Sequence, residues 1–450
     1  MRLVSTHVCV REWKLTTCRQ RKTYVPRFTT PYNGDAGDAH VITPFFSPET
    51  SGEMTAMMVR SATRTLDVYT PSVESWSGCS KWNSPCVGCA PSVVRDEEAF
   101  VLFRDLLNAA NVRGVRVRLI TNKFDTVHEC YATISVLSYL SEVIEVRTYA
   151  TTTFMHGKVI IADNCTAISS VNWSKTSYIE NREAGVVVCN EKLARYAERV
   201  FAYDWNTADP WMRPKRNGIG PDDVRLMRDR SYLEPFDVQH RNISKPHYSV
   251  GAQTSVNIDG ADIQVSVSPD NAANVILRAV NETQKTLDIY TYQLTDALFA
   301  EMILEIARRK PSVKVRLLMS RAIFMDRDRI ASTKTMHDLR SAAGGNIECY
   351  SSPSYIRYAH LKIIIIDGAS VVVQTGNLSP SDLPYPAAPF EPFGSPGWKS
   401  INRDFEVIIR DARVTKTFMD LFEGELRFST IYVDPRKFNV NPKKGNVQLQ

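Results

Sequence analysis

Two copies of a histidine–lysine pattern stand out among the residues that could do chemistry. The pattern is His-x-Lys-x-x-x-x-Asp, and an Asn follows each copy: His156, Lys158, Asp163 and Asn172, then His360, Lys362, Asp367 and Asn377. An imidazole can act as a nucleophile or as a general acid and base, while ammonium and amide groups can bind phosphoryl oxygens. The doubled pattern therefore indicates two similar halves that each contribute half of one phosphate-handling site.

The alternation of side chains along a strand separates the His and Lys from the Asp within each pattern. On a strand, His and Lys two positions apart face the same side, so both can reach one ligand. The apolar runs 159–162 and 363–366 predict buried strand after each Lys. Asp163 and Asp367 have the opposite parity and lie near the strand ends. We expect these two aspartates to be structural.

Further polar residues follow each pattern at matching positions. Glu183 and Asp404 stand in Asn-Arg-Glu and Asn-Arg-Asp sequences, and a carboxylate there could orient a catalytic imidazole. Glu180 and Glu406 are alternatives that break the alignment of the two copies.

Small hydroxyl residues also recur, because Ser170 and Thr375 each stand two positions before the Asn. We expect them to support a loop that binds phosphate.

The elements around the patterns repeat as well. Ser-Pro followed by an acid predicts a helix start at Ser47 and at Ser268, with Ser as the N-cap and Pro in the first turn. Apolar periodicity predicts helices and strands in matching pairs: strands 66–69 and 287–290, helices 97–110 and 296–309, strands 115–120 and 313–318, and closing helices 191–202 and 414–423. Alternating strands and helices predict an α/β fold.

The domain organisation follows from this repeat and from composition. We expect a basic tail (1–40), a first half (41–205), a linker rich in Pro, Gly and charge (206–260), a second half (261–432) and a C-terminal tail (433–450). The segment 380–400, dense in Pro, Phe and Gly, is either a rigid lip beside the site or a plain loop.

Bulk composition limits the class of protein. The chain has 450 residues, 43% hydrophobic and 23% charged, with a net charge of +6, which permits an anionic partner without requiring one. No stretch approaches the ~20 apolar residues that span a bilayer. Residues 1–30 are basic, like an import presequence or a disordered tail, and we favour the tail.

Nine cysteines are scattered along the chain, and three of them cluster at Cys79, Cys86 and Cys89. A zinc site would need a fourth ligand, such as His128 or Cys130, and no second close pair is present. We favour a loop with reduced thiols, with one disulfide inside the cluster as the next alternative.

With these residues in view, the chain resembles the phospholipase D superfamily, in its form with two HKD motifs in one polypeptide. The resemblance covers about residues 41–430 and includes the stretch from Asn172 to Val186 after the first motif. The usual Gly-Ser before the Asn is replaced by Ser169-Ser170 and Gln374-Thr375. The resemblance implies two α-β-α sandwich halves of the phospholipase D type, packed as a pseudo-dimer with one shared active site.

The resemblance also implies a mechanism. One imidazole attacks phosphorus to form a phosphohistidine, and the other protonates the leaving oxygen and then activates water. By analogy, His156 is the nucleophile and His360 the acid. Lys158, Lys362 and the two Asn hold the phosphoryl oxygens. No metal or cofactor is expected, because the two lysines supply the positive charge.

Several readings of the substrate remain open. We favour hydrolysis on the head-group side of a phospholipid, with a membrane surface as partner and a monomeric chain. The alternative is a nuclease acting by the same two-His mechanism; phosphatidyl transfer and an inactive scaffold are less favoured. A cytoplasmic or membrane-peripheral location is expected, with organelle import through the basic N-terminus as the other reading.

Overall fold

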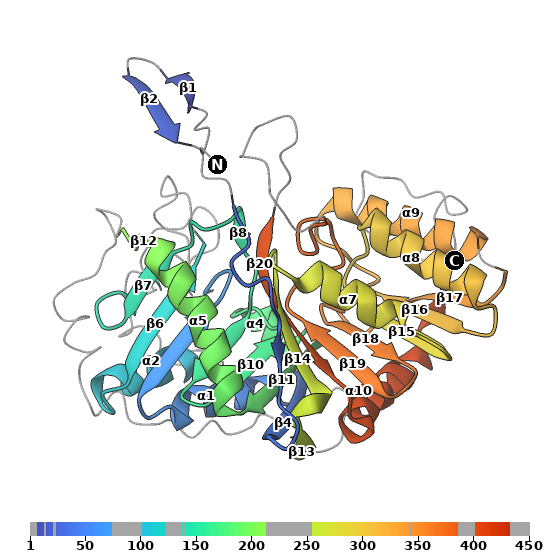
Figure 1. Cartoon of the computed structure of the whole chain (residues 1–450), viewed down its shortest axis with the longest axis horizontal. Coiled ribbons are helices and arrows are strands. Elements are labelled where there is room, and N and C mark those ends of the chain that lie inside the picture. The colour runs from blue at the N-terminus through green and yellow to red at the C-terminus, as the bar shows by residue number, and fades with distance from the viewer. Residues whose placement is uncertain are drawn as a thin grey trace.

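The computed structural model describes residues 7–12, 15–20, 24–73, 101–122, 137, 140–212, 254–342, 344–385 and 401–432. Two halves lie side by side, each built around one sheet (Figure 1). The cysteine cluster Cys79/Cys86/Cys89, most of the linker and the C-terminal tail lie outside the described residues.

The first half is built around a mixed sheet. In the described chain it has nine strands in the order β12 (Asp209–Pro210), β7 (Glu145–Thr148), β6 (Arg116–Thr121), β5 (Thr65–Tyr69), β9 (Val159–Ala162), β10 (Cys165–Ser169), β11 (Glu183–Cys189), β4 (Ala39–Ser47) and β13 (Val256–Asp259). β5, β6 and β7 are parallel, and the other pairings are antiparallel.

The second sheet repeats this order. Its main path through the described strands is β21 (Thr430–Ile431), β17 (Ile347–Ser351), β16 (Lys314–Met319), β15 (Thr286–Thr291), β18 (Lys362–Ile366), β19 (Ser370–Gln374), β20 (Asn402–Ile409), β14 (Ile263–Ser268) and β3 (Tyr32–Asn33). The short β8 (Phe154–Met155), directly before His156, pairs with β20, so a segment of the first half extends the second sheet (Figure 1).

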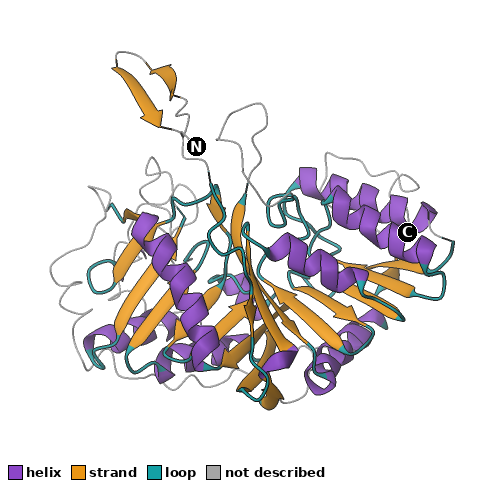
Figure 2. Cartoon of the chain, viewed as in Figure 1, coloured by secondary structure: helices purple, strands orange, loops and turns teal. Residues whose placement is uncertain are grey.

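Helices cover both faces of each sheet (Figure 2). On the outer faces lie α1 (Ser51–Ser61) and α2 (Val101–Asn111) in the first half, and α7 (Ala272–Asn281), α8 (Ala297–Arg309) and α9 (Asp326–Ala342) in the second. The closing helices α5 (Glu191–Thr207) and α10 (Ala412–Leu426) pack into a third core shared by both sheets. The predicted α/β fold with two sandwich halves is confirmed.

The predicted helix starts at Ser47 and Ser268 are wrong. Ser47 ends β4 and Ser268 ends β14, and the helices begin four residues later, at Ser51 and Ala272. The serine carbonyls accept hydrogen bonds from Arg182 and Arg403, at 2.6 and 2.9 Å. These two serines therefore end strands, where their carbonyls bind the buried arginines, and do not take the N-cap position that Ser often occupies.

Each sheet has an edge strand from a segment that was expected to lie outside its half. The expected domain boundaries at residues 40 and 260 therefore do not match the sheets. β3, inside the segment expected as a tail, pairs with β14 of the second sheet. β13, at the end of the expected linker, pairs with β4 of the first sheet. Tyr24 is also buried and donates a 2.7 Å hydrogen bond to Asp270. Residues 24–40 are thus part of the packed body, while β1 (His7–Glu12) and β2 (Leu15–Gln20) form a hairpin that projects from it (Figure 1).

Two buried arginines link the halves in a matching way. Arg182 of the first half binds Glu425 of α10 at 2.5 Å, and Arg403 of the second half binds Asp204 of α5 at 2.9 Å. Both guanidinium groups are at most 1% exposed. A buried charge must be paired, and each arginine has one acid from the other half and one from its own, Glu49 or Asp270.

Two further features concern cysteines and membranes. Cys165 and Cys189 form a disulfide between the start of β10 and the end of β11, a pair that was not predicted. Among the described helices, none combines the length and the apolar character needed to cross a membrane.

Candidate active site

Both motif histidines lie just before a strand of their own half. The parity argument had placed them on the strand itself. β9 begins at Val159 and β18 at Lys362. The backbone N–H of His156 donates to the carbonyl of Arg403 at 3.0 Å, and that of His360 donates to the carbonyl of Arg182 at 2.8 Å. Each histidine is therefore anchored to the other half of the chain.

The acids reach across the same boundary. Nδ1 of His156 lies 3.1 Å from Oδ1 of Asp404, and Nδ1 of His360 lies 2.8 Å from Oε2 of Glu183. Both acids lie on central strands and are fully buried. Each half thus provides the carboxylate for the imidazole of the other half. An imidazole N–H that donates to a carboxylate is fixed in orientation and made more basic.

Ser170 and Thr375 bind these acids, whereas the sequence suggested a role beside the phosphate. The hydroxyl of Ser170 donates to Glu183 Oε2 and that of Thr375 to Asp404 Oδ1, both at 2.6 Å. The same hydroxyls accept backbone N–H groups of Ala184 and Phe405 at 3.0 Å. Each hydroxyl therefore holds an acid in place at the end of its loop.

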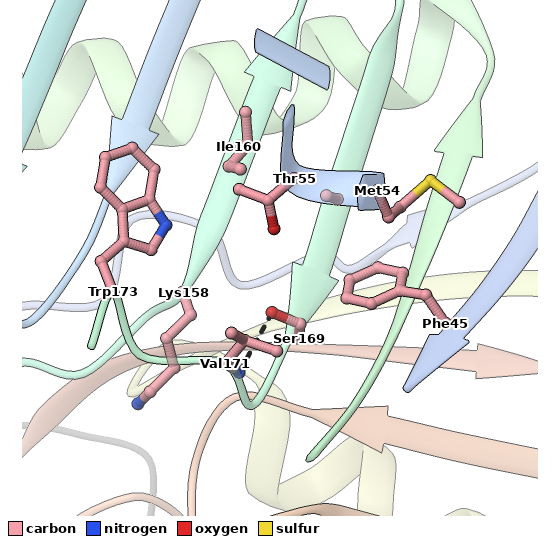
Figure 3. A pocket seen from close by; sticks show the side chains of 9 residues that line it. Phe45, Met54, Thr55, Lys158, Ile160, Ser169, Val171 and Trp173 are labelled. Carbon is pink, nitrogen blue, oxygen red and sulfur yellow. Dashed lines mark hydrogen bonds between the residues drawn. The ribbon is translucent and has the colours of Figure 1, made fainter. Parts of the chain in front are cut away.

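The lysine ammonium groups face the centre of the site. Nζ of Lys362 lies 2.9 Å from Nε2 of His360, and Nζ of Lys158 donates to the carbonyl of His156. Figure 3 shows the stem of Lys158 beside Val171 and Trp173, with its amino group directed away from Ile160. Burial lowers the pKa of Lys158 to about 8; burial and the charge of Lys158 lower that of Lys362 to about 7.

The two imidazoles are both biased toward the neutral form. Burial and the neighbouring Lys158 charge lower the pKa of His156 well below its usual 6.5. Burial also lowers the pKa of His360, although the adjacent Glu183 carboxylate opposes the shift. A neutral imidazole can act as a nucleophile, and the one with the stronger carboxylate partner gains a proton more readily.

The pKa values of the two acids, Glu183 and Asp404, are shifted in opposite directions. Burial acts against ionisation of Glu183, but the charges of His360 and Lys362 outweigh it and the pKa of Glu183 is lowered. For Asp404, burial prevails over the charge of Lys158 and raises the pKa. The two sides of the site are therefore alike in geometry, and their acids differ in the direction of the pKa shift.

The two asparagines sit beside this cluster and are half-buried. The N–H of Asn377 donates to Oδ2 of Asp382 at 3.0 Å, and no donor in the described chain reaches its buried Oδ1. The carbonyl of Asn172 accepts from Ser174 at 2.8 Å. Both side chains remain candidates for binding a phosphoryl group.

Asp163 and Asp367 lie at the far ends of β9 and β18, away from the histidines. Asp163 accepts hydrogen bonds from the backbone N–H groups of residues 63–65, and Asp367 from those of residues 284–286. Both have positive φ, 50° and 55°, a region that Asp tolerates better than most residues. Each joins the turn after its strand to the start of the neighbouring strand.

Sequence reasoning missed two residues of the site. Asp382 is buried, and its Oδ1 lies 3.4 Å from Nδ1 of His156. The ring of Tyr292 lies 4.9 Å from that of His360 and 5.6 Å from Nζ of Lys362. Tyr292 follows β15 directly, so its place after a repeated strand was a usable signal. Asp382 stands where the first half has Ser177, so a search for residues that both halves share passed over it.

One group of described side chains has metal-ligand geometry: atoms of His156, Asp382 and Asp404 lie within 4.8 Å of one another. Three of their four carboxylate oxygens already accept hydrogen bonds, however. Asp382 accepts from Asn402 and Ser379, and Asp404 accepts from Thr375. These residues fit a hydrogen-bonded acid cluster better than an open metal site.

Comparisons with known proteins agree with this geometry. Residues 89–205 and 276–426, more than half of the chain, match the family model described as "Cardiolipin synthase, PLD-like domain". No curated protein sequence matches significantly.

Two solved structures are similar to this chain, and the first of them, at a TM-score above 0.5, shares its fold. Phosphatidylserine synthase from Haemophilus influenzae Rd KW20 is 11% identical, with a TM-score of 0.57 and 89% of each chain covered. The phospholipase D family member Nuc from Salmonella typhimurium is 22% identical over 38% of this chain and 98% of its own, with a TM-score of 0.29. Both halves of this chain carry the motif and share the domain, and the chain therefore belongs to the phospholipase D superfamily.

Proposed function

We propose that the protein hydrolyses a phospholipid on the head-group side of its phosphate. The observation that carries the proposal is the crossed arrangement, in which two imidazoles are each held by a carboxylate of the other half with two lysines between them. Two positioned imidazoles suit a two-step displacement at phosphorus, and buried ammonium groups stabilise its charged transition states.

In the first step, Nε2 of His156 attacks phosphorus as the bond to the head-group oxygen breaks, and His360 gives its proton to that oxygen. This leaves a phosphatidyl group on His156. In the second step, neutral His360 takes a proton from water, and the water oxygen attacks phosphorus. The N–P bond breaks, its electron pair returns to Nε2, and phosphatidate leaves.

The contacts of the two rings support this assignment of roles. Nε2 of His156 has no hydrogen-bond partner among the described residues and is open to attack phosphorus, whereas Nε2 of His360 is occupied by Nζ of Lys362 at 2.9 Å. Glu183 also favours the ionised state, which stabilises a protonated His360. His156 therefore suits the nucleophile and His360 the acid, as the family resemblance implies.

A lipid substrate is supported by the family and by the surface near the site. The matching family model and the fold neighbour are both named for phospholipid synthases. Phe324 and Met325 are 78% and 52% exposed. Their loop is tied to the site, because the N–H of Phe324 donates to the Tyr292 hydroxyl at 2.6 Å. Exposed apolar side chains beside the site suit contact with a lipid surface.

The test offers phosphatidylcholine vesicles and single-stranded DNA separately to the purified protein, without divalent metal. We expect choline and phosphatidate as products, with the DNA intact. Added glycerol tests the acceptor, because phosphatidylglycerol as the main product would identify a transferase. Cleavage of DNA with intact lipid would overturn the proposal. His337→Ala on the outer helix α9 serves as the active control variant.

A further inference from the structure

One side of the site carries a carboxyl that the other side lacks. In the first half, Ser174 Oγ accepts from the N–H of Ser177 at 3.3 Å and bonds its hydroxyl at 3.1 Å. In the second half, Ser379 Oγ accepts from the N–H of Asp382 at 3.3 Å and bonds its carboxyl at 2.7 Å. Asp382 therefore occupies the place of Ser177, with the same local hydrogen bonds.

Asp382 forms a carboxyl pair with Asp404. The two side chains are at most 2% exposed, and a carboxylate oxygen of each lies within 4.8 Å of one on the other and of a ring nitrogen of His156. Two carboxylates this close in a buried site repel each other when both are ionised, so one of them keeps its proton. Oδ2 of Asp404 is buried and no described group donates to it. That oxygen is the natural place for a proton held between the two acids.

The surrounding chain makes room for the pair. A Cβ added at Gly376 would lie 2.8 Å from Cγ of Asp404 and 3.0 Å from Cβ of Asp382. The first half has Val171 at the matching position before its Asn. The half that has the two carboxyl groups therefore also has the glycine that leaves space for them.

The shorter side chain of Asp404, compared with Glu183, explains why a second acid, Asp382, is present. In the first half, Asn181 donates to Oε1 of Glu183 at 3.1 Å. In the second half, the matching Asn402 donates to Asp382 at 2.6 Å. Asp404 is one methylene shorter than Glu183. Together, Asp382 and Asp404 make the contacts that Glu183 makes alone.

We propose that Asp382 is a positioning residue that shares one proton with Asp404 and so gives the His156 side of the site a single negative charge. It also ties the Asn377 loop to this pair through the Asn377 N–H. The charged and titratable groups that face the pair are His156, Lys158 and Lys362, with Glu406 on the same strand.

For the reaction proposed above, on which this inference rests, the shared proton has a consequence. A phosphohistidine leaves most readily when its other ring nitrogen is protonated, and Asp404 holds that N–H. Two full charges would over-stabilise the cationic intermediate and slow its hydrolysis. One shared proton keeps the charge on this side equal to that on the Glu183 side.

The first test does not require activity. Asp382→Asn replaces the acid by a neutral group that can still donate to Asp404, so the net charge is kept. We expect the carbon-13 NMR titration of His156, assigned by the loss of its signal in His156→Ala, to move by less than about 0.5 pH unit. Infrared difference spectra should show one protonated carboxyl fewer than the wild type.

The opposite results would overturn the inference. If both acids are ionised, Asp382→Asn removes a charge, the His156 titration falls by about 1 pH unit or more, and no carboxyl band is lost. If Zn²⁺ raises the melting temperature of the wild type and not of Asp382→Asn, the cluster is a cation site. These readouts stand even if the lipid assay fails.

The second test uses turnover. Asp382→Ala should lower kcat/KM by about 10–100-fold, and Asp382→Asn should restore most of that loss. Ser177→Ala, the matched change in the first half, should cost less than Asp382→Ala because no proton is held there. Equal losses in Asp382→Ala and Asp382→Asn would contradict a shared proton and would leave the proposed reaction intact.

Discussion

The His156 side and the His360 side of the site share a backbone plan and differ in their acids. Each imidazole is anchored to, and oriented by, the other half. At His360 the partner is one glutamate with a lowered pKa. At His156 the partner is a pair of aspartates with raised pKa values. The duplicated fold fixes where the groups lie, whereas a few substitutions decide which group carries a proton.

The largest expected effect tests whether the two sides perform different steps. His156→Ala and His360→Ala should each reduce turnover by about 10⁴-fold, because each removes a group needed in both half-reactions. With a substrate whose leaving group needs no proton, a denaturing quench at alkaline pH of His360→Ala should trap the phosphoryl group on His156, and His156→Ala should trap none. Phosphate on His360 in either variant would reverse the assignment.

The next effect concerns the two arginines that join the halves. Arg403→Met should lower the free energy of unfolding by about 3–5 kcal/mol, because it leaves two fully buried acids without a counter-ion. Arg182→Met should cost less, because its partner Glu49 is 14% exposed and can be hydrated. Chemical denaturation measures both values. A larger loss in Arg182→Met would contradict the difference in burial between the two sites.

A smaller effect compares the acids. Glu183→Gln removes the only carboxylate that contacts Nδ1 of His360 among the described residues, and should lower kcat/KM by about 100-fold. Asp404→Asn leaves Asp382 to carry the charge at His156, and should cost only about tenfold. Steady-state kinetics on the same substrate decides the order. A reversed order would show that Asp382 cannot stand in for Asp404.

The smallest expected effect is the change of kcat/KM with pH. The reaction needs neutral His156, whose pKa is lowered well below 6.5, and protonated His360, whose pKa is also lowered. Activity should therefore rise through the pKa of His156 and fall through that of His360, with an optimum on the acid side of 6.5. Loss of the Lys362 and Lys158 protons at about 7 and about 8 should steepen the fall. A maximum of kcat/KM above pH 8 would contradict this order.

Sequence reasoning predicted the repeated elements because local periodicity decides them. The helix expected at 296–309, for example, is α8, Ala297–Arg309, with Asp296 as its N-cap. The crossed pairing could not be predicted, because Glu183 and His360 are 177 positions apart and only the packing of the two sheets joins them. Asp382 escaped for a related reason: a comparison of repeats finds what the halves share and passes over what one half has alone.

The exchanged edge strands have a consequence for synthesis of the chain. Asn33 bonds to Gln264, a separation of 231 residues. At about 5–20 residues per second, a ribosome needs roughly 10–50 s to make that stretch. The N-terminal edge strand must stay unpaired for that time, and Arg182 must wait longer still for Glu425, the second of its two acids. We expect the nascent chain to become protease-resistant only after the second sheet has been made, because the edge of that sheet formed by β14 is then available to pair with β3.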